Sequence, residues 1–261
     1  MSQSYPAVSV KVYDDNSSDD TWQLEKKYPQ VGWEFGKENR GYVYARNKLM
    51  SGTDAQFFCS LDDDSWFIKP GSLSKSIEYL DKNPKVAAVA FDILSPDRAA
   101  EVVEGTPIEV NSFIGCGHVL RISSAREVGL YDPPPSFYGG EEKDLCIRLI
   151  DKGYKVMLLP GVHVWHDKTN VARDLKAQHR SGICNDLVFT WRRTPFVLLF
   201  PALFAKLVSH VMFASRFRKG LLLRSCFQGF RDFFGVLFRG KVHRRPVSIA
   251  TFRTFRTLNK I

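Results

Sequence analysis

Cysteine is sparse in this sequence, and it does not form a framework. Five cysteines are spread over 261 residues, at positions 59, 116, 146, 184 and 226, and no two of them form a C-x-x-C pair. Structural zinc sites and disulfide-rich secreted domains need closely spaced or paired cysteines. We therefore expect reduced thiols in the core of a cytosolic protein.

Internal repeats and low-complexity tracts are also missing from the sequence, and its opening residues predict no N-terminal leader. The lack of a repeat of roughly 20–50 residues excludes solenoids, collagen-like chains and coiled coils. The opening residues, MSQSYPAVSV, lack a basic region followed by a long apolar run, so no signal peptide is expected. Hydrophobic residues make up 44% and charged residues 25% of the chain, which predicts an ordinary buried core.

Acidic residues are scarce in the last third of the chain. Residues 1–170 hold 19 Lys and Arg against 25 Asp and Glu, whereas residues 171–261 hold 18 against 3, together with 13 of the 20 phenylalanines. An acidic region suits a metal site, and a basic, aromatic region suits an anionic surface. We expect a sheet domain at 1–170 and a basic helical extension at 171–261.

Short apolar strands alternate with helical segments in the first region. The pattern predicts strands at 8–13, 57–61, 86–90 and 155–159, and helices near 21, at 40–51, at 71–82 and from 141. This alternation predicts an α/β fold with a mostly parallel sheet covered on both faces. In such sheets ligands bind at the carboxyl ends of the strands. The acidic clusters at 14–20 and 62–64 fall at such ends.

Three consecutive aspartates, Asp62, Asp63 and Asp64, follow one of the apolar strands. Like charges this close raise one another's pKa and cost stability unless a cation lies among them. Carboxylates suit Mg²⁺ or Mn²⁺, which also take substrate phosphates as ligands. A solvated acidic turn is the alternative, but the preceding strand, a later acidic pair and His166 favour a metal site.

A second carboxylate cluster, Glu141, Glu142 and Asp144, opens a predicted helix. The helix dipole favours anions there, so charge compensation is one explanation. The functional explanation is that one carboxylate accepts a proton from an attacking hydroxyl. By itself, His166 is either a metal ligand or a surface histidine, and Arg46 is a surface charge.

Taken together, these segments resemble the inverting, nucleotide-sugar-dependent glycosyltransferases of family two, of the rhamnosyltransferase-like type that serves cell-surface polysaccharides. The resemblance extends over residues 1–195 and implies the GT-A fold, a Rossmann-like, mostly parallel sheet flanked by helices. It rests on motifs in a fixed order: K-V-Y-D-D-N-S-S-D-D-T at 11–21, N-R-G and A-R-N at 39–47, D-D-D at 62–64, G-C-G at 115–117, E-V-G-L-Y-D at 127–132 and G-G-E-E-K-D-L at 139–145.

On the donor side, the resemblance implies that Asp14 binds the nucleotide base, with Asp15 as the alternative. It implies that Arg46 approaches the diphosphate. It also implies that Asp62 lies toward the ribose and the metal, and that Asp63 joins it in binding the donor. The partner implied is a nucleotide-diphosphate sugar.

The resemblance further implies that Asp64 is the principal ligand of Mn²⁺ or Mg²⁺ and that His166 completes the metal site with Asp62. The second acidic position of the G-E-D-x-D-L motif supplies the general base, which is Glu142 here, with Glu141 and Asp144 as further candidates. The acceptor-side candidates are Gly115, Cys116, Gly117 and Gly140.

The reaction implied is a single displacement. The metal neutralises charge on the leaving diphosphate, and the base deprotonates an acceptor hydroxyl that attacks and inverts the anomeric carbon of a hexosyl or deoxyhexosyl group. The family's fold opens with a strand and a helix before the segment at 8–13, so we expect a sheet domain that is incomplete at its N-terminus. A missing central strand exposes edges that favour aggregation.

The run PFVLLFPALFAKLVSHVMFA, residues 195–214, approaches the length of a membrane span. Pro201, Lys206 and His210 weaken that interpretation. Arginines and phenylalanines alternate after it, as in an interfacial helix whose rings enter the acyl boundary while its cations contact anionic headgroups. We expect interfacial helices over 195–245, with a single span or docking onto a protein surface as alternatives. This predicts a protein at the inner face of the cell membrane, with a lipid-linked glycan acceptor.

Three other functions compete with sugar transfer. A metal-dependent phosphoesterase or nuclease would use the aspartates and the histidine, but it gives no reason for the turn at Asp14 or for the ordered glycine motifs. A nucleic-acid module on 171–261 is allowed by charge, since phosphate contacts need only Lys and Arg. The continuous apolar runs suit lipid better, so no nucleic-acid partner is expected. A non-catalytic scaffold is the third alternative.

Overall fold

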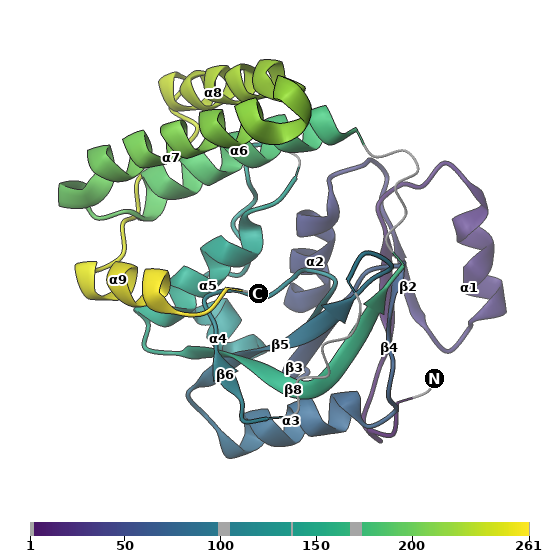
Figure 1. Ribbon diagram of the computed structural model, residues 1–261. Helices are drawn as coiled ribbons and strands as arrows, with labels where there is room; N and C mark the ends of the chain where they lie inside the picture. Colours follow the sequence, from purple (N-terminus) through teal and green to yellow (C-terminus); the bar gives the residue numbers. More distant parts are fainter. Residues whose placement is uncertain (1–2, 99–104, 137, 168–173, 261) are drawn as a thin grey trace.

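The computed structural model describes residues 3–98, 105–136, 138–167 and 174–260, and its centre is a mixed sheet (Figure 1). The strand order is β3-β7-β5-β8-β4, and β6 pairs with β8. The strands are β3 (Phe57–Leu61), β4 (Ser65–Phe67), β5 (Val86–Leu94), β6 (Ile108–Glu109), β7 (Gly117–Arg121) and β8 (Lys155–His166).

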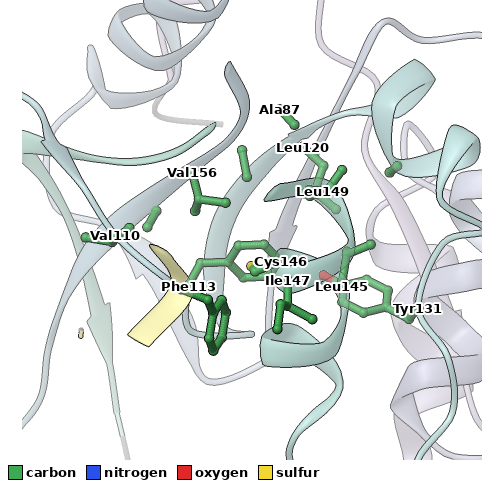
Figure 2. Packing of buried hydrophobic residues seen from close by; sticks show 14 of the residues in the cluster. Ala87, Val110, Phe113, Leu120, Tyr131, Leu145, Cys146, Ile147, Leu149 and Val156 are labelled. Carbon is green, nitrogen blue, oxygen red and sulfur yellow. The ribbon is translucent and has the colours of Figure 1, made fainter. Parts of the chain in front are cut away.

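Helices cover both faces of this sheet. On one face, α3 (Ser72–Lys82) packs through Leu73, Ile77 and Leu80. The other face is covered by α2 (Tyr42–Ser51), α5 (Glu141–Asp151) and α9 (Ile249–Thr257), with the short α4 (Ile122–Glu127) beside them. Figure 2 shows Leu145 and Leu149 of α5 among Leu120, Val156 and their neighbours. Every residue of β5 is buried, as the central strand of a sheet covered on both faces should be.

The expectation of a mostly parallel sheet is wrong in detail. Strands β5 and β8 pair in parallel, whereas β7 runs antiparallel to both β3 and β5, and β4 and β6 run antiparallel to β8. A parallel pair needs a crossover of about a dozen residues or more, and the segment with α4 and α5 lies between β5 and β8. The turn at Asp62–Asp64 instead leads from β3 to β4, at the opposite end of the strand order.

Strand β8 does not end at Leu159, as the sequence predicts. It continues through Pro160 and Gly161 to His166, because the pairing with β5 jumps from Leu158 to His163 across a bulge. Proline is tolerated in a strand at such a bulge, and Gly161 has a φ of +74° that favours glycine. The continuation carries His166 to the end of the strand that faces the aspartates.

The segment before α2 forms a separate ribbon. Strand β1 (Lys11–Asp14) pairs in parallel with β2 (Gly32–Phe35), and η1 (Asp20–Gln23) and the short α1 (Leu24–Lys27) connect them. A cavity of about 2130 Å³ is lined by β1 on one side and β3 on the other. The two sheets are therefore distinct, and the cavity extends between them.

A helical layer follows the sheet. It consists of α6 (Leu175–Arg193), α7 (Phe196–Arg216), η2 (Phe217–Gly220) and α8 (Leu223–Phe238), at the top of Figure 1. The layer has its own apolar core, which includes Ile183, Leu187, Ala214, Cys226 and Phe233. All five cysteines are free, and four of them are buried, which confirms the expectation of core thiols.

The last helix returns to the sheet domain. Phe252 and Phe255 of α9 belong to the same buried cluster as α5 and the central strands. Asn111 donates a backbone hydrogen bond to the carbonyl of Asn259, which fastens the chain end to the same region. The C-terminal region is therefore not a simple appendage, and the expected boundary at 170 lies outside the described residues.

Candidate active site

The large cavity gathers candidate side chains from all three acidic clusters, at 14–20, 62–64 and 141–144. It is bounded by the ends of β1, β3 and β8, the first turns of α2, the loop before β7 and the start of α5. The candidates that line it are Asp14, Asp15, Arg46, Asp62, Asp63, Asp64, Gly115, Cys116, Glu141, Glu142 and His166. Motifs more than 100 residues apart in sequence thus share one cavity.

The turn after β3 is fixed by Ser65. Its hydroxyl accepts from the backbone N–H of Asp62 at 2.8 Å and lies 3.0 Å from the carbonyl oxygen of Cys116. Ser65 is also the register partner of His166 in the β4–β8 pair. As a result, Oδ2 of Asp64 lies 3.2 Å from Nε2 of His166, and Sγ of Cys116 lies 3.5 Å from its Nδ1.

Arg46 is buried among these carboxylates, unlike a surface charge. Its Nη2 donates to Oδ1 of Asp62 at 2.7 Å, and its Nη1 lies 3.8 Å from Oε1 of Glu141. Gly115 packs directly against this group. A Cβ there would lie 2.6 Å from Oε1 of Glu142 and 2.8 Å from Nη1 of Arg46.

The two glutamates at the start of α5 differ in environment. Glu141 is buried, and its Oε2 has no hydrogen-bond partner among the described residues. Glu142 is half-buried and reaches the cavity. Burial and, after it, the charge of Glu141 raise the pKa of Glu142 to about 8, with Arg46 acting in the opposite direction. Burial and the charge of Glu141 also raise the pKa of Tyr42, whose hydroxyl oxygen accepts from the N–H of Gly139.

Asp144 lies apart from the cavity. Arg193 of α6 donates to both of its carboxylate oxygens, at 2.6 and 2.9 Å, and Nε of Arg148 donates to Oδ2 at 2.9 Å. Asp144 and Arg193 are both buried. The structure thus places this acidic candidate in an ion-pair cluster that joins α5 to α6, not beside Glu142.

The two aspartates at the end of β1, Asp14 and Asp15, hold the adjacent turns. Oδ1 of Asp14 accepts from both the N–H and the hydroxyl of Ser17, at 3.0 and 2.5 Å. Asp15 instead accepts from the backbone N–H groups of Arg40 and Gly41, just before α2. Since Asp15 uses both oxygens in this way, Asp14 has more capacity left for a ligand.

A buried polar chain supports the loop at Gly115, and sequence reasoning missed most of it. The side chain of Asn47 bonds both the N–H and the carbonyl of Tyr131. The carbonyl of Ile114 can only accept, so Nδ1 of His118 donates to it at 3.3 Å, and the hydroxyl of Tyr131 donates to Nε2 at 2.8 Å. Burial and then the charge of Arg46 lower the pKa of His118 to about 3, so it is neutral. The sequence signals for this chain are the Asn of A-R-N and the Tyr of E-V-G-L-Y-D.

The acceptor-side candidates divide into two pairs. Gly115 and Cys116 line the cavity, but Gly117 and Gly140 do not. A Cβ at Gly117 would lie 2.5 Å from Cδ1 of Ile93, so that glycine serves close packing in the core. Gly140 has a φ of +102° and begins α5, so its role is conformational.

The described residues contain no cluster of three or more His, Cys, Asp or Glu arranged to hold a metal ion. Asp64 and His166 are close to each other, while Asp62 is bonded to Arg46. Mg²⁺ is commonly bound by one or two carboxylates with substrate phosphates completing the shell. The donor set therefore fits an ion that arrives with a diphosphate.

The solved structures that this fold resembles include glycosyltransferases. The structure superposes on TarS of S. aureus in complex with UDP-GlcNAc with a TM-score of 0.64 at 15% identity, over 89% of this chain and 74% of that one. A mannosyltransferase from Pyrobaculum calidifontis, PcManGT with GDP-Man and Mn²⁺, gives 0.57 at 15% identity, over 98% and 75%. GalNAc-T7 with UDP, GalNAc and Mn²⁺ gives 0.55 at 14% identity over 70% of this chain, which spans 44% of that protein. At these identities the likeness establishes the GT-A fold.

No curated protein matches the sequence. Residues 1–104, which contain the aspartate turns and the A-R-N motif, match the family described as Glycosyl transferase family 2. Residues 1–104 are therefore similar in sequence to family 2 glycosyltransferases, and the solved structures show that the fold is shared.

Proposed function

We propose that this chain is an inverting glycosyltransferase that moves a sugar from a nucleotide-diphosphate donor to a hydroxyl of a glycan acceptor. The observation that carries the proposal is the position of Glu142. This half-buried carboxylate lines the same cavity as Asp62, Asp64, His166 and Arg46. A base and a set of diphosphate-binding groups around one cavity are what a single displacement needs.

The donor end is assigned to the aspartates and Arg46. The similar proteins were solved with UDP-GlcNAc and with GDP-Man, which supports a nucleotide-sugar donor. Asp14 is proposed for the base, Arg46 for the diphosphate, and Asp62 and Asp63 for the rest of the donor. Asp64 and His166 would hold Mn²⁺ or Mg²⁺, which when bound neutralises charge on the leaving diphosphate.

Glu142 is proposed to remove the proton of the acceptor hydroxyl. A general base works best when its pKa is near the operating pH, and the pKa of Glu142 is raised to about 8. Glu141 is the alternative, but it is almost completely buried.

The acceptor is proposed to be a lipid-linked glycan of cell-surface polysaccharide synthesis, and the transferred group a hexosyl or deoxyhexosyl unit. The site would then work at the inner face of the cell membrane. The support is the apolar exposed surface of α7 in the helical layer, which begins directly after α6. Gln178 of α6 lines the cavity, so the layer adjoins the site.

The experiment that tests this function replaces the base. Glu142→Gln keeps the shape of the side chain but cannot accept the proton, so turnover should fall about 10²–10⁴-fold. Donor affinity should stay within a factor of about two to three, because the donor contacts are assigned to other residues. Glu78→Gln, on the exposed face of α3, is the matched control. Unchanged turnover in Glu142→Gln would move the base to Glu141.

A second variant tests the donor end. Asp64→Ala removes a proposed metal ligand, so calorimetric titration with a nucleotide-diphosphate sugar should lose its dependence on Mn²⁺. Retained Mn²⁺-dependent affinity would contradict the metal assignment. A wild-type chain that binds donors but transfers or hydrolyses none of them would support the non-catalytic scaffold instead.

A further inference from the structure

Helix α7 has its apolar side chains outside. Its solvent-facing positions recur every three to four residues, so they form one stripe along the helix. The exposed residues of the stripe are Phe196, Val197, Phe200, Pro201, Phe204, Ala205, Val208, Ser209, Met212 and Phe213. Phe196, Phe200 and Phe204 are each 65–69% exposed. The stripe has no charged side chain until Arg216.

Lys206 and His210 of α7 point toward α6. Nζ of Lys206 lies 2.9 Å and Nε2 of His210 lies 3.1 Å from Oδ2 of Asp186 on α6. Lys143 of α5 bonds the other oxygen of Asp186 at 2.5 Å. These contacts fix the rotation of α7, because turning the helix over would separate both of its cations from Asp186.

The same contacts distinguish surface docking from a membrane span. By length and composition α7 could cross a bilayer, and only Leu199 and Ala214 among its residues are fully buried. A crossing orientation would either break the ion pairs of Asp186 or carry them into hydrocarbon, where charged groups are costly. A helix that stays packed along α6 and α8 presents only its outer stripe.

Helix α8 adds cations beside this apolar surface. Its exposed stripe alternates guanidinium groups and rings: Arg224, Phe227, Arg231, Phe234 and Phe238. Interfacial helices combine aromatic side chains at the acyl boundary with Lys and Arg at anionic headgroups. The layer lies away from the sheet in Figure 1, and it belongs to residues 171–261, which hold 18 basic and 3 acidic residues in all. Because the region is strongly basic, it favours an anionic lipid surface over a neutral one.

We propose that the α7–α8 hairpin docks this protein onto an anionic bilayer, with α7 lying in the plane of the membrane. The rings of the α7 stripe enter the acyl boundary, and Arg224 and Arg231 contact headgroups. The inference concerns binding alone, so it stands or falls separately from sugar transfer.

Vesicle flotation of the full chain tests the docking. The protein should float with phosphatidylcholine vesicles that contain phosphatidylglycerol, and bind pure phosphatidylcholine vesicles at least about tenfold more weakly, because the headgroup attraction is missing. Raising the salt from about 0.1 to 0.5 M should weaken binding, since it shortens the screening length. Equal binding to both vesicle types would overturn the anionic part of the proposal.

Two pairs of substitutions separate the contribution of the aromatic rings to vesicle binding from that of the arginines. Phe200→Glu with Phe204→Glu should lower binding at least tenfold. Arg224→Gln with Arg231→Gln should lower it about 30-fold, which corresponds to about 1 kcal/mol for each lost cation. All four side chains are exposed, so the unfolding midpoint should not change.

The matched controls are on the sheet domain, where Ile68→Glu and the pair Lys82→Gln with Lys152→Gln also change exposed side chains. They should float like wild type. Retention of the wild-type chain after alkaline carbonate extraction would show a span and overturn the in-plane orientation. Docking to lipid would be overturned if the variant with Phe200→Glu and Phe204→Glu floated as well as the wild-type chain. It would also be overturned if the wild-type chain did not float and formed a dimer instead.

Discussion

Glu142 has a raised pKa, and this sets the pH range in which it can act as a base. Burial and the neighbouring Glu141 favour its protonated form, which gives a pKa of about 8. Only the deprotonated carboxylate can accept a proton. We therefore predict that turnover is low at pH 6, rises through about pH 8 and levels off above it.

Glu141→Gln tests the cause of that shift. It removes the negative charge that raises the pKa of Glu142, so the midpoint of the pH–rate profile should move to lower pH. Initial rates at saturating donor and acceptor over pH 5–10 would show this. A midpoint that stays in place, with turnover lost, would instead assign the base to Glu141.

Gly115 is predicted to be essential because of its neighbours. A Cβ would lie 2.6 Å from Oε1 of Glu142 and 2.8 Å from Nη1 of Arg46, so both groups must shift. A displacement of about 1 Å in a catalytic group can cost about 10²-fold in rate, so Gly115→Ala should lower kcat/KM by about that factor. Gly182→Ala on α6, where a Cβ meets nothing within 4 Å, should leave kcat/KM unchanged.

At the scale of elements, α5 and α6 depend on the pairing of Asp144 with Arg193. Both groups are buried, and removal of one partner from a buried ion pair costs about 3–5 kcal/mol. Arg148 still bonds Asp144, so Arg193→Ala should lower the free energy of unfolding by about 3 kcal/mol in urea titration. Lys82→Ala, which breaks an exposed pair with Glu78, should cost less than about 1 kcal/mol. Equal losses of unfolding free energy in the two variants would contradict the role of the Asp144–Arg193 pair in holding α5 to α6.

Several elements were predictable from the local sequence pattern because their packing in the tertiary structure agrees with that pattern. The strand at 57–61 and the helices at 40–51 and 71–82 match β3, α2 and α3 closely. The helix expected near Thr21 is only a short 3₁₀ turn and one helical turn, since it contributes no buried residue to any core. Strand β8 was predicted too short, because the pairing with β5 overrides the break that Pro160-Gly161 suggests.

At the scale of the whole molecule, the β1–β2 ribbon should be the least stable part of the sheet region. A two-stranded sheet is marginal by itself, and most residues of β1 and β2 are exposed or half-buried, whereas all of β5 is buried. We predict that amides of β1 and β2 exchange with deuterium at least about 100-fold faster than those of β5. Mass spectrometry of peptic fragments would measure this, and equal protection would mean that the ribbon is held as firmly as the main sheet.

The sequence by itself determined which chemistry is present. Ordered motifs carry the aspartates, Arg46, the glutamates and His166, and the charge division separates an acidic region from a basic one. Local spacing was enough to identify these candidate residues, because they follow directly after strands or stand at the start of helices. The carboxyl ends of parallel strands share one edge of a sheet, where ligands bind.

Only the tertiary structure decided what each candidate touches. Asp144 and Glu142 are two residues apart on α5, yet they lie on different faces of it, so one pairs with Arg193 of α6 and the other reaches the cavity. Likewise Lys206 and His210 interrupt an apolar run in sequence, and only packing against Asp186 shows that they point inward. The physical reason is that a side chain's pKa and partners depend on elements far away in sequence, which no local pattern contains.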